Sequence, residues 1–340
     1  MTVEQRIDAF VSLGDLLVKK TPELLETLER ASHRNHWYTV ANSLKQIDEI
    51  AVNLTKSKLR EWLDPYNFSQ YPKSVGLILA GNLPLVGFHD ILSVLLAGFR
   101  AQIKVSSDDA GLTTYVLGKL IEIEPSFSEQ IEIVERLTDF DLIIATGSDN
   151  SSRYFDYYFG KKPNIIRRNR NSVAILDGTE TTEQLRALGN DIFDYFGLGC
   201  RSVSKIFLPK GYQINNFFEP LESFSEIASH YKYANNYDYN KSIYLINREK
   251  HYDNGFLLLK EDERIASPLA VVFFQEYDSI RELSAQLDAQ VEKIQCITTQ
   301  LTIDVDIPTF PLGRSQCPSL TDYADGVNTL EFLKGHADQN

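Results

Sequence analysis

From residue 74 onward, short apolar runs alternate with segments of helical periodicity. The run SVGLILA at 74–80 ends at Gly-Asn and then Pro, which is typical of a strand buried on both faces. A helical segment at about 86–98 and a second strand-like run, AQIKVSS at 101–107, follow it. Strands that alternate with helices pair in parallel through right-handed crossovers. The chain is therefore predicted to be an α/β protein built on parallel sheets.

The rest of the chain fits this class. Apolar residues recur at helical spacing over residues 1 to about 64, which predicts a helical N-terminal region. The tyrosine-rich stretch 231–240 is expected to be a polar surface loop. A length of 340 residues suits two domains, which we place at 1–170 and 171–340. Further strands are expected at 129–134, 141–145, 173–176, 205–208, 243–246, 269–274 and 294–298, and helices at 113–121, 182–196, 218–230 and 278–287.

Composition limits the kinds of protein that this chain can be. The formal net charge is −13, which disfavours a phosphate-backbone binder, so no nucleic-acid partner is expected. Three cysteines in a chain of this length do not make a disulfide framework and fit a reducing compartment. The N-terminus lacks the basic and apolar regions of a signal peptide, and no apolar run is long enough to span a membrane. We expect a cytoplasmic protein.

Two histidines raise the question of a metal site. His33 and His36 lie in the polar link SHRNHW, at a spacing that can bind a metal. No cysteine or acidic residue nearby completes a ligand set. We therefore expect a surface connector here and predict no metal site.

Cys200 lies where a helix is expected to pass into a strand. The stretch DIFDYFGLGCRSVSKIFLP at 191–209 reads as a helix end, a Gly-Leu-Gly turn, the cysteine and a β-rich run. Gly197 and Gly199 permit a tight turn and a close approach to the backbone, which suits a nucleophilic thiol. Arg201 can stabilise a thiolate or form a surface ion pair. Cysteine is also among the most buried residue types, so this stretch alone leaves a reactive and an inert thiol equally open.

A second turn of small residues, Thr146-Gly147-Ser148, follows the strand predicted at 141–145 and precedes a helical segment. Such a turn can present backbone N–H groups to a phosphate at the edge of a parallel sheet. Ser148 can equally be an ordinary helix cap, since the full glycine-rich fingerprint of a dinucleotide site is absent.

Four separated motifs occur in order: LAGNLPL at 79–85, AGFRAQIKVS at 97–106, TGS at 146–148 and FGLGCRS at 196–202. This order resembles the aldehyde dehydrogenase superfamily. The fuller pattern, with GNLPLVG, GLGCRSVSK and FPLGRSQ followed by DYADG, is more similar to the LuxC-type fatty acyl-CoA reductases. The resemblance extends from about residue 70 to the C-terminus. It implies an aldehyde dehydrogenase-like fold, with a Rossmann-like cofactor-binding domain after the helical region in 1–170 and an α/β catalytic domain in 171–340.

The resemblance also implies catalytic residues. Cys200 matches the nucleophile that accepts the acyl group as a thioester. Asn82 matches the side-chain amide of the oxyanion hole, with the Cys200 backbone N–H as its partner. Cys296 and Cys317 match no catalytic position. Asn82 by itself could be a turn residue, which turns often contain.

Cofactor-binding positions are implied in the same way. Lys104 matches the lysine that holds the adenosine ribose, although alone it could be a charge at a sheet edge. The turn of Gly147 and Ser148 matches the pyrophosphate site, and Pro268 resembles a proline near the nicotinamide. Ser106 and Ser107, which lie two and three positions after Lys104, are implied to belong to the same ribose-binding region. Phe310 to Gly313 resembles a late motif that lines the substrate entrance.

Two departures from the superfamily pattern inform the expected chemistry. Aldehyde-oxidising relatives carry a glutamate that activates the hydrolytic water, and the aligned segment RRNRN at 167–171 has no carboxylate. Without that base, hydrolysis is disfavoured, while a thiol can still exchange thioesters. The family's ribose-binding glutamate falls at Ser107, which leaves room for a 2′-phosphate and favours NADP(H) over NAD(H). The neighbouring Asp108 and Asp109 could reverse that preference.

The expected function is NAD(P)H-dependent reduction of a fatty acyl thioester to the aldehyde, through a thioacyl intermediate on Cys200. The acyl donor is expected to be acyl-CoA or an acylated partner protein, with an acyltransferase or synthetase complex and a homo-oligomer as candidate assemblies. Two alternatives stay open: an aldehyde dehydrogenase that works oxidatively, and a non-catalytic scaffold of an acyl-transfer complex. A simple cysteine acyltransferase is less favoured, because no His and Asn or Asp pair stands in a recognisable context.

Overall fold

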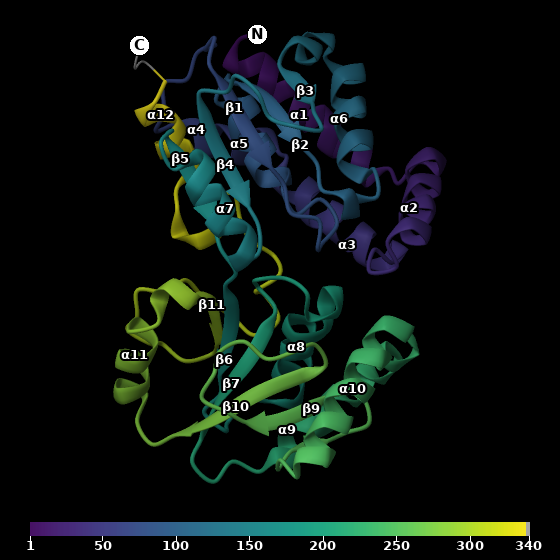
Figure 1. Cartoon of the computed structure of the whole chain (residues 1–340), viewed down its shortest axis with the longest axis vertical. Helices are drawn as coiled ribbons and strands as arrows, with labels where there is room; N and C mark the ends of the chain where they lie inside the picture. The colour runs from purple at the N-terminus through teal and green to yellow at the C-terminus, as the bar shows by residue number, and fades with distance from the viewer. Residues whose placement is uncertain (338–340) are drawn as a thin grey trace. The chain divides into compact units, whose positions relative to one another are not determined.

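The computed structural model describes residues 1–337, which form two compact units (Figure 1). Unit 1 comprises Met1–Asn169 and Ser319–Asn340, and unit 2 comprises Arg170–Pro318. The C-terminal segment therefore belongs to unit 1, whereas the sequence analysis assigned every residue after 170 to the second domain. Its helix α12 (Thr329–Gly335) explains the return, because Leu330 and Leu333 are fully buried in the core of unit 1.

The N-terminal region is helical, as predicted. Each of its four helices begins at a threonine whose side-chain oxygen accepts a backbone N–H from the first turn. Such caps satisfy N–H groups that have no partner within the helix and each stabilises it by about 1 kcal/mol. The helices are α1 (Val3–Val18), α2 (Pro22–Arg34), α3 (Val40–Asn53) and α4 (Lys56–Leu63).

A five-stranded parallel sheet in the order β3-β2-β1-β4-β5 forms the centre of unit 1. The edge strand β5 was not predicted, because its four residues lie between a proline and a run of arginines. The strands are β1 (Ser74–Ile78), β2 (Arg100–Lys104), β3 (Ile131–Ile133), β4 (Leu142–Thr146) and β5 (Asn164–Arg167), and the helices between them are α5 (Phe88–Leu96), η1 (Ser107–Asp109), α6 (Leu112–Ile123), η2 (Pro125–Glu129) and α7 (Asp149–Phe159).

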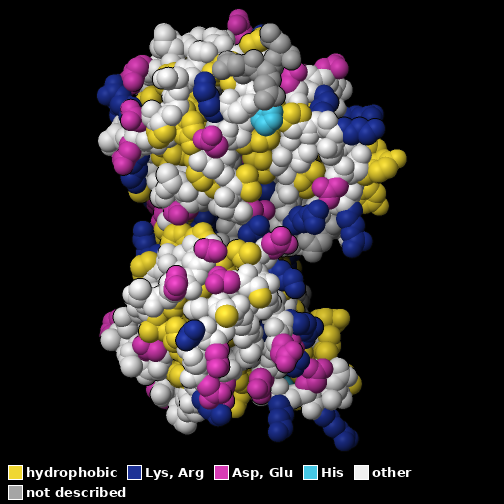
Figure 2. All heavy atoms as spheres, turned by 90° about the vertical axis from the view of Figure 1, so that its left-hand side faces the viewer, with side chains coloured by type: hydrophobic (Ala, Val, Ile, Leu, Met, Phe, Trp, Pro, Cys, Tyr) yellow, Lys and Arg dark blue, Asp and Glu magenta, His cyan; other side chains and the backbone are white. Residues whose placement is uncertain are grey.

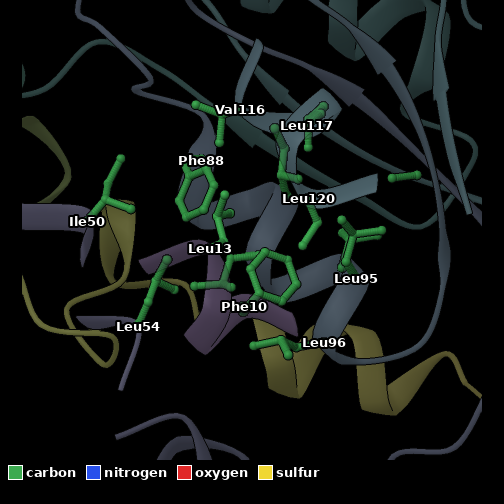
Figure 3. Packing of buried hydrophobic residues seen from close by; sticks show 14 of the residues in the cluster. Phe10, Leu13, Ile50, Leu54, Phe88, Leu95, Leu96, Val116, Leu117 and Leu120 are labelled. Atoms are coloured by element: carbon green, nitrogen blue, oxygen red, sulfur yellow. The ribbon is translucent and has the colours of Figure 1, made fainter. Parts of the chain in front are cut away.

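The helical region and the sheet share one hydrophobic core. Phe10 of α1 is fully buried and makes edge-on ring contacts with Phe88 of α5 and with Phe127. Figure 3 shows Phe10 and Leu13 among side chains of α5 and α6, with Leu120 close by. The N-terminal helices are therefore an integral part of the fold of unit 1.

Unit 2 contains a seven-stranded sheet in the order β12-β11-β6-β7-β10-β9-β8, in which only the short β8 pairs antiparallel. The central strands are almost wholly buried, and the buried residues include polar ones such as Lys205 and Gln295. The strands are β6 (Asn171–Ile175), β7 (Val203–Pro209), β8 (Tyr252–Asp253), β9 (Leu258–Glu261), β10 (Val271–Tyr277), β11 (Ile294–Thr299) and β12 (Thr309–Phe310). The helices are α8 (Thr182–Phe193), η3 (Asp194–Gly197), α9 (Ile214–Leu221), η4 (Glu222–Ser229), α10 (Tyr231–Asn247), α11 (Ile280–Asp288), η5 (Val291–Lys293) and, in unit 1, η6 (Ala324–Gly326).

Helix α10 corrects two predictions. Residues 231–240 were expected to be a loop and 243–246 a strand, but both lie in this one helix. Tyr233, Tyr237 and Tyr244 recur at helical spacing and are buried on one face. The hydroxyl of Tyr233 donates to the Phe256 carbonyl at 3.0 Å, and that of Tyr237 donates to the Asp253 carboxylate at 2.5 Å. Tyrosine can bury its ring when its hydroxyl finds such a partner, so a stretch that looked polar forms an inward-facing helix.

On the face drawn in Figure 2, acidic side chains are interspersed with basic ones on both units. Within residues 1–337, no helix is long and apolar enough to cross a membrane. The same part of the chain contains no group of three or more His, Cys, Asp or Glu side chains that could hold a metal ion.

Candidate active site

The carboxyl ends of β1, β2 and β4 lie side by side in the sheet of unit 1. Ile78 at the end of β1 pairs with Lys104 on one side and Ala145 on the other. The chain runs outward from β1 to β2 and β3, then returns to β4 and β5 on the opposite side, so the strand order reverses beside β1. Open α/β sheets bind ligands at this kind of switch point. Asn82 lies in the turn after β1, and Gly147 directly follows β4, so these predicted site residues share one edge of the sheet with Lys104.

The turns after β1 and β2 touch each other. A Cβ added to Gly81 would lie 2.5 Å from the Oγ of Ser106 and 2.7 Å from its Cβ, so only glycine fits. The Ser106 side chain accepts the N–H of Asp108 and thereby caps η1. Ser107 and Asp108 are exposed at this edge, whereas Asp109 is buried and accepts two hydrogen bonds from the first turn of α6. Of the two acids that follow Ser107, only Asp108 is exposed.

The turn after β4 packs closely on the helix that it begins. The Ser148 side chain accepts the N–H of Ser151 at 3.3 Å, so the interpretation of Ser148 as a helix cap is confirmed. A Cβ on Gly147 would lie 2.8 Å from both the Phe155 ring and the Ser151 Cβ, which leaves no room for a side chain. The first N–H groups of α7 have no acceptor within the helix, and such a helix start can bind a phosphate.

Cys200 lies in the loop between η3 and β7 of unit 2, and it is half-buried. Three consecutive residues before it have left-handed backbones: Tyr195 (φ 52°), Phe196 (φ 60°) and Gly197 (φ 78°). The sequence predicted the turn at Gly197 but not at the two aromatic residues. Each non-glycine residue in this conformation costs about 1–2 kcal/mol. Both aromatic side chains are buried, and this packing holds the turn that precedes the cysteine.

The backbone of Cys200 is held by Ser172 at the start of β6. The Ser172 hydroxyl donates to the Cys200 carbonyl at 3.0 Å and lies 3.0 Å from the Sγ of Cys296. Cys296 is fully buried, and burial raises the pKa of its thiol to about 11. At neutral pH Cys296 is therefore a protonated, inaccessible thiol, in contrast to the half-exposed Cys200.

Asp191, in the last turn of α8, organises the segment 310–316. Its buried carboxylate accepts hydrogen bonds from the Gly313 N–H (2.6 Å), the Ser315 N–H (2.9 Å), the Ser315 hydroxyl (2.7 Å) and the Thr298 hydroxyl (3.0 Å). Burial raises the pKa of this carboxyl group, and the donated hydrogen bonds oppose that shift. The carboxylate thus fixes the FPLGRSQ motif to the helix that leads into the cysteine turn.

The same segment borders the residues after Cys200. Arg201 donates to the Ser315 carbonyl at 3.4 Å, and its guanidinium lies 5.3 Å from the centre of the Phe310 ring. Gln316 donates to the Ser202 hydroxyl oxygen at 3.1 Å. The predicted substrate-entrance motif therefore packs beside the cysteine loop within unit 2.

An Asp191→Asn substitution is expected to lower the free energy of unfolding by about 2–3 kcal/mol. The amide offers one acceptor oxygen in place of two and turns its own N–H groups toward buried donors. Urea unfolding measures the change. Glu180→Gln is the matched control, because this half-buried carboxylate accepts two backbone N–H groups just before the same helix, and it should cost under about 1 kcal/mol. Equal losses for the two variants would contradict the role given to Asp191.

Pro268 lies at the same edge of the unit 2 sheet as the cysteine loop. β7 and β10 are parallel neighbours with Lys205 opposite Phe273, so their amino ends lie together. Cys200 precedes β7 and Pro268 precedes β10. A Cβ on Gly197 would lie 3.8 Å from the Leu269 side chain, which places the cysteine turn against the Pro268 segment.

A comparison of the sequence with known protein families shows which family the chain belongs to. The family model described as Acyl-CoA reductase (LuxC) matches residues 19–233, more than half of the chain. The chain belongs to this family. The matched range contains Asn82, the TGS turn and Cys200. No curated protein matches the sequence.

Solved structures share the fold of this LuxC-family chain at low sequence identity. A benzaldehyde dehydrogenase from Corynebacterium glutamicum is 13% identical, with a TM-score of 0.68 over 91% of this chain and 81% of that one. Aldehyde dehydrogenase 21 from Physcomitrella patens is 13% identical, with a TM-score of 0.67 over 99% and 85%. An indole-3-acetaldehyde dehydrogenase solved with NAD+ is 12% identical, with a TM-score of 0.67 over 88% and 72%. The predicted aldehyde dehydrogenase-like α/β fold is confirmed.

Arg167, in the segment that lacks the expected carboxylate of aldehyde-oxidising relatives, has a structural role in this LuxC-family chain. It ends β5, is buried, and pairs with the buried Asp90 of α5. Its guanidinium also donates to the Thr329 hydroxyl at 3.1 Å. This arginine therefore connects the edge of the unit 1 sheet to α5 and α12.

Sequence reasoning missed the residues that support the site. Asp191 lies on the apolar stripe of its helix, three residues after the buried Leu188 and beside the buried Ile192. A carboxylate on such a stripe is rarely buried without partners, and this is the signal that could have identified it. Ser172 offered no signal, because a lone serine at the start of a strand is ordinary.

Proposed function

We propose that this protein reduces fatty acyl thioesters to aldehydes with NAD(P)H, through a thioacyl intermediate on Cys200. One observation carries the proposal. A half-exposed thiol follows a strained turn of three left-handed residues, within the range matched to the acyl-CoA reductase family. Backbone strain of this kind clusters at functional sites, and an accessible thiol is the form that reacts.

The proposed reaction begins with attack of the Cys200 thiolate on the thioester carbonyl. The bond from the carbonyl carbon to the donor's sulfur breaks, and that thiolate leaves and takes up a proton. Bound NAD(P)H supplies the hydride that reduces the thioacyl carbon. The bond to the Cys200 sulfur then breaks, and the aldehyde leaves. In both steps, the acylation of Cys200 and the reduction of the thioacyl group, the Asn82 amide and the Cys200 N–H donate to the former carbonyl oxygen, which carries the negative charge.

The sequence around 167–171 supports transfer without hydrolysis. It holds no carboxylate to activate water, and the structure uses Arg167 to join β5 to its neighbours. A thioacyl enzyme that lacks a general base for water persists until reduction or thioester exchange removes the acyl group. This absence disfavours the oxidative alternative.

The residues at the carboxyl edge of unit 1 fit a nicotinamide dinucleotide. Gly81 and Gly147 leave no room for side chains, and the start of α7 offers backbone N–H groups. We propose that Lys104 holds the adenosine ribose, with Ser106 and Ser107 beside it, and that the turn of Gly147 and Ser148 holds the pyrophosphate. Pro268 of unit 2 is proposed to lie near the nicotinamide.

We propose NADP(H) as the preferred cofactor, because the exposed Ser107 leaves space for a 2′-phosphate and Asp109 is turned inward. A Ser107→Glu substitution should shift the ratio of kcat/KM values toward NADH by about tenfold, since the carboxylate repels a 2′-phosphate and accepts from a 2′-hydroxyl. Ser126→Glu adds the same charge on η2, away from this edge, and should leave the ratio unchanged. If Ser107→Glu left the ratio of the kcat/KM values unchanged, Ser107 would not lie at the ribose site.

The direct test is anaerobic incubation with a panel of acyl-CoAs and either NADPH or NADH. Loss of reduced-cofactor absorbance together with aldehyde formation supports the proposal. Steady release of free acid from aldehyde and NAD(P)+ would favour the oxidative dehydrogenase instead. Failure to bind either nicotinamide cofactor would favour a non-catalytic scaffold of an acyl-transfer complex. We propose acyl-CoA or an acylated partner protein as the donor.

A further inference from the structure

The connector between α2 and α3, residues 35–39, contacts both turns at the carboxyl edge of the unit 1 sheet. The Asn35 side-chain amide donates to the Asp108 carbonyl at 2.9 Å in the turn after β2. The Tyr38 hydroxyl lies 2.8 Å from the Gly81 carbonyl oxygen in the turn after β1. The sequence predicted only a surface connector here. His33 and His36 are exposed, but Tyr38 is fully buried beneath the site edge.

The Tyr38 hydroxyl has two acceptors, and they flank Asn82. Its proton is shared between the carbonyl oxygens of Gly81 (2.8 Å) and Leu83 (2.9 Å). The Gly81 carbonyl belongs to the same planar peptide unit as the N–H of Asn82. Tyr38 therefore holds the peptide unit before Asn82 and the peptide unit after Leu83, which sets the direction in which the exposed Asn82 side chain leaves the turn.

Two further features show that this turn is held from both sides. The missing side chain of Gly81 lets Ser106 approach so closely that a Cβ would collide with it. Burial, with the nearby charges of Asp109 and Asp108, raises the pKa of the Tyr38 hydroxyl far above its ordinary value. The hydroxyl therefore remains a donor at every working pH.

We infer that Tyr38 is a positioning residue, which aligns the Asn82 amide with the oxygen that becomes negatively charged on the substrate. This inference rests on the proposed thioester reduction. The N-terminal helical region then contributes to catalysis by supporting the turn that carries the oxyanion donor. An oxyanion donor is effective only when it lies about 2.7–3.1 Å from the oxygen that becomes charged, so a relaxed turn that displaces the donor lowers the rate while substrate binding changes little.

The test uses Tyr38→Phe, which keeps the buried ring and removes only the hydroxyl. Quench-flow with labelled acyl-CoA should show acyl-enzyme formation about tenfold slower, with the KM for NADPH changed less than twofold. Tyr233→Phe is the matched control, because Tyr233 is a buried tyrosine of unit 2 whose hydroxyl donates to a backbone carbonyl at 3.0 Å. It should lose comparable stability and keep the wild-type rate of acyl-enzyme formation.

A double-mutant cycle separates positioning from general damage. In an Asn82→Ala background, Tyr38→Phe should slow acyl-enzyme formation less than twofold, because the donor that it aligns is gone. The same tenfold loss in both backgrounds, or a full rate in Tyr38→Phe alone, would overturn the inference.

Amide hydrogen exchange gives a readout that does not depend on turnover. A peptide spanning 79–88 should exchange at least tenfold faster in Tyr38→Phe than in the wild type, and in Tyr233→Phe it should not. Unchanged exchange would overturn the inference whatever the activity. A wild-type chain that forms no acyl-enzyme would refute the proposed function, and the exchange rates would still decide whether Tyr38 fixes the turn.

Discussion

Cys200→Ala is expected to abolish both acyl-enzyme formation and aldehyde production. The substitution removes the only atom that can carry the acyl group in the proposed reaction, so the loss should exceed about a thousandfold. The native structure should persist, because Cys200 is half-exposed in a loop and the hydrogen bond from the Ser172 hydroxyl goes to its backbone carbonyl, which alanine keeps. Incubation with radiolabelled acyl-CoA, followed by denaturation, measures the covalent adduct.

Cys317→Ser is the matched control for this experiment. Cys317 is the other half-exposed cysteine of unit 2, so it tests whether any accessible thiol takes up the label. Its variant should be labelled and turn over at the wild-type rate. Label that attaches to Cys200→Ala at the normal rate would mean that Cys200 is not the nucleophile.

Asn82→Ala is expected to lower kcat by about 10²–10³, the typical cost of losing one oxyanion donor. The KM for the cofactor should change little, because the substitution leaves the β2 and β4 turns as they are. The stability loss should also be small, since the side chain is exposed. Steady-state kinetics with NADPH and a saturating acyl-CoA give both constants.

Asn67→Ala provides the comparison for that variant. Asn67 is an exposed asparagine in the loop before β1, at the amino end of the sheet, so its removal should leave kcat unchanged. If Asn82→Ala turned over as fast as Asn67→Ala, Asn82 would have no part in stabilising the oxyanion.

Much of the fold could be read from the sequence, because its strongest signals are local. Helical spacing predicted the N-terminal helices, and short apolar runs predicted buried strands such as β1. The prediction failed where tertiary packing overrides composition. The tyrosines of α10 are buried through hydroxyl partners that lie elsewhere in the chain, at Phe256 and Asp253. The return of 319–337 to unit 1 depends on the packing of Leu330 and Leu333 against core residues that lie hundreds of positions earlier in the sequence.

The site could be predicted only in part, for a similar reason. Gly81, Gly147 and Cys200 stand in motifs whose residue types reveal a tight turn or a reactive atom. The residues that support them act through long-range backbone contacts, and nothing in their local sequence reveals these. Tyr38 reaches the carbonyl groups around Asn82, and Asp191 reaches the backbone of the 313–315 loop.

The central claim is that Cys200 passes its acyl group to hydride and not to water. Intact-protein mass spectrometry after a single turnover tests it most directly. Incubation with acyl-CoA alone should add one acyl mass, located on the peptide that contains Cys200, and the adduct should persist in buffer. Addition of NADPH should remove the adduct and yield one equivalent of aldehyde. An adduct that disappears in buffer with release of free acid, or that never forms on Cys200, would contradict the account.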